Sequence, residues 1–273
     1  MMTKDISEIS SRYNIFLIDL YGVIHDGINP FEDAIDAVNY LKDKEKRVIF
    51  FSNSPRPKDL VRKKLLSMSE KLQDFEIVTS GEFFAYILQH TERYNFTFLK
   101  NAAFVLSNDM NHPLLGTQYL RITDDMEAAS YILIIAATEN KLNISMFDVL
   151  MKKAIALGLP CLCPNPDLIA TNGENIVYAA GSFALRYKEL GGVVHYIGKP
   201  EVSFYNFALK DCNEVKQNII AIGDNINTDI KGAINFDIDS VLISNGIHKN
   251  VNLNELIGNS GITPTYIMKN LVI

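Results

Sequence analysis

The sequence predicts an α/β fold, a doubly wound parallel sheet with helices on both faces, and three features lead to this prediction. Short runs of β-branched residues recur and are apolar at successive positions, which is typical of strands covered on both faces. Segments with helical spacing lie between these runs. The chain has 273 residues, 48% apolar and 21% charged, which suits one large globular domain or two smaller ones.

The expected elements alternate between strand and helix, which favours a parallel sheet connected through helices. Apolar runs predict strands at Ile15–Ile18, Val48–Phe51, Phe75–Val78, Ala103–Leu106, Ile132–Ala136, Val193–Ile197, Ile219–Ile222 and Val241–Ile243. A helix is expected over Phe31–Leu41, with one face made of Ala34, Ile35, Val38 and Leu41. Another is expected over Ile144–Leu157, with a face made of Phe147, Val149, Leu150 and Ile155.

Composition excludes several classes of protein. Lysine and arginine number 26 against 32 aspartates and glutamates, and this net charge of −6 argues against a nucleic-acid surface. Three cysteines are too few for a disulfide framework and fit the cytoplasm. The first ten residues lack an apolar export segment, and the longest apolar run, 131–137, is far shorter than the ~20 residues that span a bilayer. We expect a cytoplasmic protein with a small-molecule partner and with no nucleic-acid or membrane partner. Both a monomer and a homo-oligomer are compatible with the sequence.

The first segment with chemical potential is 16–27, Phe-Leu-Ile-Asp-Leu-Tyr-Gly-Val-Ile-His-Asp-Gly. Asp19 directly follows an apolar strand, and parallel sheets present their ligand-binding groups at this carboxyl edge. Gly22 permits a sharp turn close behind it. The Asp19 carboxylate is a candidate nucleophile or metal ligand, and the alternative is a turn or helix-capping aspartate.

Two further segments place polar groups after strands. The strand at 48–51 is followed by Ser52 and Asn53, whose hydroxyl and backbone N–H groups suit an anion, although a plain turn before a helix is the better explanation when this segment is read alone. Arg56, nearby, is either a surface charge or a phosphate contact. Lys199 follows the strand at 193–197, where it is able to neutralise a phosphate and a neighbouring carboxylate together.

The fourth segment, 219–229, is the most specific. A strand runs into Gly223 and Asp224, and Asp229 follows five residues later at the start of a helix. Two carboxylates so placed suit Mg²⁺, which prefers oxygen ligands. The alternative for Asp229 is a favourable charge at a helix N-terminus.

The order and type of these four segments resemble the haloacid dehalogenase (HAD) superfamily. The long insert between the second and third segments, with Cys163-Pro-Asn-Pro-Asp-Leu-Ile-Ala-Thr-Asn-Gly173 and 182–199, resembles the class IIA branch, which includes NagD-like and p-nitrophenyl-phosphatase-like enzymes. The resemblance covers residues 14–247. It implies a Rossmann-like core over 1–80 plus 187–273 and an inserted α/β cap over 81–186.

The resemblance also implies roles for the residues at the carboxyl edge. Asp19 becomes the nucleophile that forms an aspartyl phosphate, and Lys199 balances charge on Asp19 and on the phosphoryl group. Mg²⁺ is held by Asp19, the backbone carbonyl of Tyr21 and Asp224, with Asp229 in support.

On the substrate side, the resemblance implies that Ser52 and the Asn53 amide bind the transferring phosphoryl group. In the cap, Asn165 and Asp167 are expected to select the substrate, and the alternative is a turn built by Asn-Pro-Asp. The reaction expected is Mg²⁺-dependent hydrolysis of a small phosphomonoester, a sugar phosphate or a nucleotide monophosphate.

The sequence departs from the family pattern at Tyr21. Phosphatases of this family usually carry an Asp there that protonates the leaving oxygen and later activates water. A tyrosine is a poor general base at neutral pH, and such help is worth about 10²–10⁴-fold. Three outcomes stay open: slow catalysis, replacement by His25 or Asp26, or phosphate-ester binding without efficient turnover. Asp-x-Tyr-Gly is also similar to the first motif of 2-haloacid dehalogenases, so dehalogenation is a further alternative.

Overall fold

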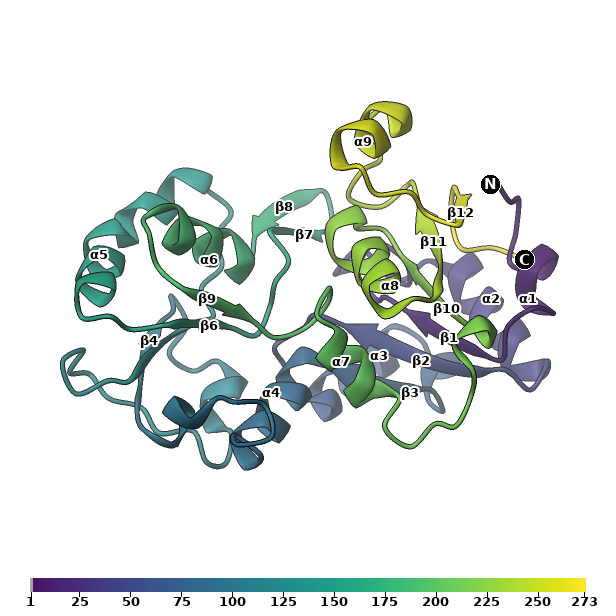
Figure 1. Cartoon of the computed structure of the whole chain (residues 1–273). Coiled ribbons are helices and arrows are strands. Elements are labelled where there is room, and N and C mark those ends of the chain that lie inside the picture. The colour runs from purple at the N-terminus through teal and green to yellow at the C-terminus, as the bar shows by residue number, and fades with distance from the viewer. Residues whose placement is uncertain (1) are drawn as a thin grey trace.

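The computed structural model describes residues 2–273, and it has two lobes joined side by side (Figure 1). The larger lobe is built on a six-stranded parallel sheet with strand order β12-β11-β10-β1-β2-β3. Its strands are β1 (Ile15–Ile18), β2 (Arg47–Ser52), β3 (Glu76–Thr79), β10 (Ile219–Gly223), β11 (Asp239–Ile243) and β12 (Tyr266–Met268). This sheet confirms the α/β parallel fold that the sequence predicts.

Strand β1 lies in the middle of the sheet and is buried on both faces. Phe16 and Ile18 pack into the apolar cluster on one face, whereas Ile15 and Leu17 pack into the cluster on the other. This alternation between two interiors explains why the strand is apolar throughout. Chain segments from both ends of the sequence therefore meet at β1.

Helices cover both faces of the sheet. Residues of α2 (Glu32–Asp43) and α3 (Lys58–Met68) belong to the first cluster, and residues of α4 (Ser80–Gln89), α7 (Val202–Ala208) and α8 (Lys231–Phe236) belong to the second. The expected face of α2 is confirmed, because Ala34, Ile35, Val38 and Leu41 are all buried. The remaining helices of this lobe are α1 (Ser7–Ser10), α9 (Leu253–Ser260) and the short turns η1 (Glu70–Leu72), η5 (Lys216–Asn218) and η6 (Ile226–Ile230).

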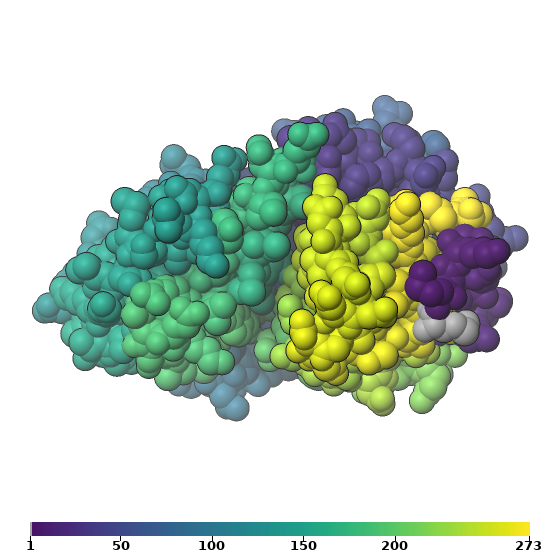
Figure 2. All heavy atoms as spheres, turned by 90° about the horizontal axis from the view of Figure 1, so that it is seen from above, coloured from purple at the N-terminus to yellow at the C-terminus, as the bar shows by residue number. Residues whose placement is uncertain are grey.

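The smaller lobe is the insert expected between the second and third segments. Its four-stranded parallel sheet has the order β4-β5-β6-β9, and a two-stranded hairpin, β7-β8, lies between the lobes (Figure 1). Its elements are β4 (Ala103–Leu106), β5 (Tyr131–Ile134), β6 (Cys161–Cys163), β7 (Ile169–Asn172), β8 (Asn175–Tyr178), β9 (Val194–Tyr196), α5 (Asp148–Ala156), α6 (Ala180–Glu189) and the turns η2 (Thr97–Lys100), η3 (Pro113–Gly116) and η4 (Lys141–Phe147). The space-filling view shows this lobe standing beside the larger one (Figure 2).

Two expectations for this lobe need correction. The predicted division before residue 187 runs through α6 and separates β9 from the sheet in which it pairs with β6, so we propose that the smaller lobe extends to Tyr196. The helical face expected over 144–157 is also wrong, because Val149 is 78% exposed. Val149 lies about 200° around an α-helix from Phe147 and so faces away from it, and α5 instead buries Met151 and Ala154, four and seven residues after Phe147.

Among residues 2–273, no helix combines the length and the apolar character that a membrane span requires.

Candidate active site

The candidate site lies at the carboxyl edge of the larger sheet. Strands β10, β1 and β2 are neighbours, and Ile18 is level with Ile222 on one side and Phe50 on the other. The residues that follow these strands, Asp19 and Asp224, and Ser52 at the end of β2 therefore converge on one place. Parallel packing thus brings together three segments that are far apart in the sequence.

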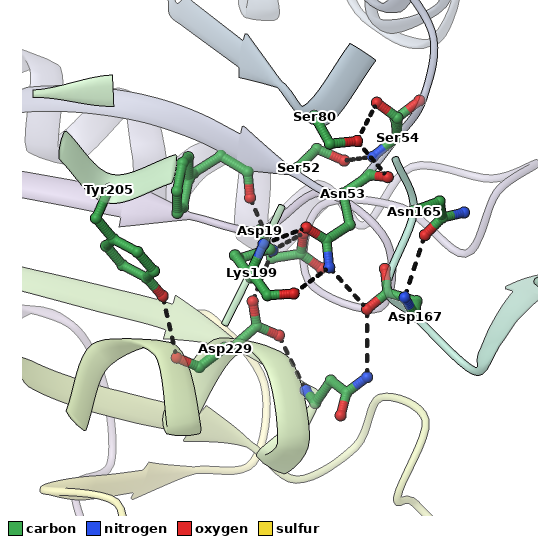
Figure 3. Close-up of polar contacts among 12 residues, drawn as sticks. Asp19, Ser52, Asn53, Ser54, Ser80, Asn165, Asp167, Lys199, Tyr205 and Asp229 are labelled. Carbon is green, nitrogen blue, oxygen red and sulfur yellow. Dashed lines mark hydrogen bonds and ion pairs between the residues drawn. The ribbon is translucent and has the colours of Figure 1, made fainter. Parts of the chain in front are cut away.

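Lys199 connects the carboxylates of this edge (Figure 3). Its Nζ donates to Asp19 Oδ1 at 2.6 Å, to Asp229 Oδ1 at 2.6 Å and to the backbone oxygen of Phe51 at 2.8 Å. All three Nζ–H bonds of the ammonium group are thereby used, and only 2% of Lys199 is exposed. The geometry places Lys199 within hydrogen-bonding reach of the candidate nucleophile.

Negative charge dominates the electrostatics of the site. Burial, together with nearby Asp229 and Asp167, raises the pKa of Asp19 to about 7 despite the opposing effect of Lys199. Burial and neighbouring carboxylates raise the pKa of Asp224 well above its usual value. Burial opposes the charge on Lys199, but the surrounding aspartates outweigh it and raise its pKa. The site therefore has more carboxylate charge than its one buried lysine offsets.

Three of these carboxylates fit a divalent metal ion. Asp19, Asp224 and Asp229 each offer an oxygen atom, and these atoms lie within 4.8 Å of one another. A set of oxygen donors suits Mg²⁺, and its charge offsets the excess of carboxylates. Asp229 is the most engaged of the three, since Oδ1 accepts from Lys199 and Oδ2 accepts from the backbone N–H of Asn225 at 3.1 Å. It therefore suits a supporting position better than a direct ligand position.

Gly22 is required where the chain turns behind Asp19. Its φ of +76° lies in the left-handed region, and a Cβ there meets Asp224 Oδ2 at 1.8 Å. The glycine thus lets the first and fourth segments approach closely, as the turn expected at this position demands.

Ser52 and Asn53 are both buried at the end of β2. Ser52 Oγ accepts from the Ser54 backbone N–H at 3.2 Å. The side chain of Asn53 instead connects the second segment to the third. Its Oδ1 accepts from the Lys199 backbone N–H at 2.7 Å, and its Nδ2 donates to the Lys199 carbonyl at 3.1 Å. Gly198, with a φ of +134°, makes room for this contact, since a Cβ there approaches Asn53 Oδ1 to 2.4 Å.

A cavity of about 270 Å³ opens between the two lobes over these groups. Asn165 and Asp167, from the loop between β6 and β7, line it from the smaller lobe, as does the hairpin with Thr171. Asp167 Oδ1 accepts from Asn53 Nδ2 at 3.1 Å and from Asn225 Nδ2 at 3.5 Å (Figure 3). The predicted site residues that line the cavity are Asp19, Tyr21, Ser52, Asn53, Asn165, Asp167, Asp224 and Asp229, and Lys199 contacts three of them, Asp19, Asn53 and Asp229.

The two groups considered as replacements for the family's acid/base Asp point elsewhere. His25 is 1% exposed, and its Nδ1 accepts from the Gly27 backbone N–H at 3.0 Å. Asp26 Oδ1 accepts from the backbone N–H groups of Ile28 and Asn29 and stabilises their turn. Neither residue is among those that line the cavity.

Sequence reasoning missed two residues that organise the site. Ser80 Oγ lies within 2.6–2.9 Å of the backbone oxygens of Asn53, Ser54 and Pro164, and so links β2, α4 and the loop of the smaller lobe. Asn225 supplies the second amide contact to Asp167. A serine at the start of a helix and an asparagine after Gly-Asp carry only ordinary capping and turn signals, so the sequence does not distinguish them.

Comparison with known protein families agrees with this geometry. Residues 16–114 match a family model described as haloacid dehalogenase-like hydrolase, and residues 196–272 match one described as HAD-hydrolase-like. The chain is a haloacid dehalogenase-like hydrolase. The two matched ranges contain the four segments that follow strands, and they flank most of the inserted lobe of this hydrolase.

Whole-chain relatives of this HAD-like hydrolase include the insert. An acid sugar phosphatase of Staphylococcus saprophyticus is 27% identical over 266 residues, which cover 95% of this chain and 96% of that protein. A solved haloacid dehalogenase-like hydrolase of Brucella suis 1330 is 25% identical with a TM-score of 0.82, over 99% of this chain and 100% of that one. A p-nitrophenyl phosphatase of Archaeoglobus fulgidus shares the fold at 23% identity, with a TM-score of 0.69 over 94% and 96% of the chains. These matches fit the class IIA branch.

Proposed function

We propose that this hydrolase is a Mg²⁺-dependent phosphatase that transfers the phosphoryl group of a small phosphomonoester to Asp19 and then to water. The observation that carries the proposal is the buried contact of 2.6 Å between Lys199 Nζ and Asp19 Oδ1, beneath a cavity that two lobes enclose. A carboxylate held next to a cation at the edge of a cavity between two lobes is a suitable nucleophile for phosphorus.

Each residue contributes a separate part of the chemistry. The Asp19 carboxylate attacks phosphorus, and the bond from phosphorus to the ester oxygen breaks. Lys199 offsets negative charge on Asp19 and on the phosphoryl oxygens as they approach. Ser52 and Asn53, buried at the end of β2, hold the phosphoryl group in line with Asp19.

A divalent ion fits this site through Asp19 and Asp224, with the Tyr21 carbonyl and Asp229 in support. Bound there, Mg²⁺ supplies positive charge that stabilises the phosphoryl oxygens. Asp224 is oriented for such a role, because its Oδ2 accepts from the Ile247 backbone N–H at 2.7 Å.

The size of the cavity favours a small substrate. About 270 Å³ accommodates a sugar phosphate or a nucleotide monophosphate, and the relative from Staphylococcus saprophyticus is called an acid sugar phosphatase. Asn165 and the hairpin residue Thr171, both lining the cavity, are placed to contact the leaving group and to select it. Such an enzyme acts on soluble metabolites, and we place it in the cytoplasm.

A panel of phosphate esters tests the proposal. The purified chain is assayed for phosphate release from sugar phosphates, nucleotide monophosphates, glycerol 3-phosphate and p-nitrophenyl phosphate, with Mg²⁺ or with EDTA. We expect Mg²⁺-dependent turnover of at least one ester, its loss in Asp19→Asn, and its retention in Asp211→Asn, which changes an exposed aspartate. Absence of turnover with every ester, or equal activity in Asp19→Asn, contradicts the proposal, and chloride release from 2-chloropropionate supports the dehalogenase alternative instead.

A further inference from the structure

Hydrolysis of an alkyl phosphate needs a proton for the departing oxygen, and Tyr21 stands where the family usually places the acid. The Tyr21 hydroxyl accepts a hydrogen bond from Lys64 Nζ at 3.0 Å, and the same ammonium group lies 4.8 Å from the centre of the ring. The Tyr21 hydroxyl is thus engaged by Lys64, and a phenol is a poor general base at neutral pH. The other residues that line the cavity are therefore the candidates for the acid and base.

Few of the residues that line the cavity are able to serve as the acid and base. Its lining among the described residues includes four carboxylates, Asp19, Asp167, Asp224 and Asp229. Three of them form the cluster that fits a metal ion. Asp167 is outside that cluster and reaches the cavity from the opposite lobe, the side on which the leaving group of the substrate must lie.

The side-chain amides of Asn53 and Asn225 position one oxygen of Asp167 in the cavity. Oδ1 accepts from the side-chain amides of Asn53 and Asn225, and Oδ2 takes part in neither contact. Burial raises the pKa of Asp167, and Asp229 acts in the same direction while Lys199 and the donors on Asn53 and Thr228 oppose it. These conditions favour a carboxyl group that holds a proton more firmly than an exposed aspartate does.

We propose that Asp167 is the general acid and base of the reaction, in place of the residue that Tyr21 replaces. The assignment rests on the phosphatase function proposed above. In the first step the Asp19 carboxylate bonds to phosphorus, the bond from phosphorus to the ester oxygen breaks, and the Asp167 carboxyl proton moves to that oxygen, which leaves as an alcohol. In the second step Asp167 takes a proton from water, the water oxygen bonds to phosphorus, and the bond to Asp19 breaks. Phosphate is released, and both aspartates return to their starting state.

This assignment makes the smaller lobe a catalytic partner. Asp167 is held to the larger lobe by Asn53, whose other amide atom contacts the backbone of Lys199. The nucleophile's lysine and the proposed acid are thus aligned through one side chain. Opening of the lobes separates Asp167 from Asp19, so proton transfer requires the closed arrangement.

The test compares two esters that differ in their need for an acid. With glycerol 3-phosphate, or with the fastest sugar phosphate of the ester panel, the leaving oxygen needs a proton so that it departs as an alcohol. With p-nitrophenyl phosphate, p-nitrophenolate departs readily without a proton. For Asp167→Asn with Mg²⁺ we expect kcat/KM for the alkyl ester to fall about 10²–10⁴-fold and that for the aryl ester to fall less than about tenfold. Because the base of the second step is also lost, p-nitrophenol should appear in a burst followed by slow turnover.

Two further variants separate proton transfer from a structural role. Asp26→Asn makes the same chemical change to a carboxylate outside the cavity, and both rates should remain within about threefold of wild type. Asp167→Ala should regain alkyl-ester turnover when formate is added, because a small carboxylic acid replaces the missing group. Thermal melting of each variant shows that it is folded.

The outcomes distinguish this inference from the proposed function. A wild type that hydrolyses no ester contradicts the phosphatase itself. Equal losses for the two esters in Asp167→Asn, unchanged rates, or a wild type that hydrolyses only the aryl ester leave phosphatase activity standing and overturn the role of Asp167.

Discussion

Lys199 Nζ lies 2.6 Å from Asp19 Oδ1 and equally close to Asp229 Oδ1, although 180 residues separate Lys199 from Asp19 in the chain. The lysine follows β9 in the smaller lobe's sheet, whereas Asp19 follows β1 in the larger one. The buried Lys199 ammonium group therefore links the nucleophile to the segment that returns from the smaller lobe to the larger one. Its removal affects both activity and stability.

Lys199→Met should abolish ester hydrolysis and lower the free energy of unfolding by about 3 kcal/mol, because loss of one partner leaves buried carboxylates unpaired. The loss of stability is limited because Asp19 is able to take up a proton once the lysine is absent. Lys71→Met is the matched control, since its ion pair with Asp36 is more than half exposed and is screened by solvent, so its loss should change stability little. Urea unfolding at pH 7 measures both, and equal losses in the two variants contradict the assigned role of Lys199.

Mg²⁺ should raise the melting temperature of the wild type, because an ion that binds only the folded carboxylate cluster stabilises it. Asp224→Asn removes one ligand and should suppress this rise, whereas Asp211→Asn should keep it. Scanning fluorimetry in EDTA and in millimolar Mg²⁺ checks the prediction. A rise of the same size in Asp224→Asn places the ion elsewhere.

Gly22→Ala should destabilise the protein by at least about 2 kcal/mol and reduce its response to Mg²⁺, because the added methyl group needs a disfavoured φ and collides with Asp224. Gly258→Ala, in α9 with open space around its Cβ, should be neutral or stabilising by up to about 1 kcal/mol. Chemical denaturation compares the two. Similar stabilities would show that the turn behind Asp19 tolerates a side chain.

Acid should destabilise the fold through His25. Burial, with Lys64 nearby, lowers the pKa of His25 from 6.5 to about 3, so the unfolded chain binds a proton that the folded chain does not. Stability is therefore present above pH 6.5 and is lost as pH falls toward 3, by about 2 kcal/mol between pH 7 and pH 5. His25→Asn keeps an acceptor for Gly27 but not the titration. Urea unfolding at both pH values in EDTA should show a smaller loss in the variant, and identical losses exclude His25 as the cause.

The sequence predicts the edge of the larger sheet well because its signals are local. An apolar run followed by Asp19, Ser52 or Asp224 marks both a buried strand and the polar group at its carboxyl end. Their convergence then follows from parallel pairing, which the structure confirms.

Contacts between the lobes leave no such local signal in the sequence. Asn53 and Asp167 are 114 residues apart, and their contact depends on how the two sheets are arranged relative to each other. The Cys-Pro-Asn-Pro-Asp run predicts a turn but not the residues that the turn faces. The same is true of β9, whose apolar run identifies a strand without showing which sheet it joins.

Direct detection of the covalent intermediate tests the central claim most sharply. The wild type is mixed with its fastest ester and Mg²⁺, quenched in acid within one turnover, and digested for mass spectrometry. We expect one added phosphoryl group on the peptide containing Asp19, which disappears as phosphate is released and is absent in Asp19→Asn. Release of phosphate with no modified Asp19 at any time, or a phosphoryl group on a different residue, contradicts this claim.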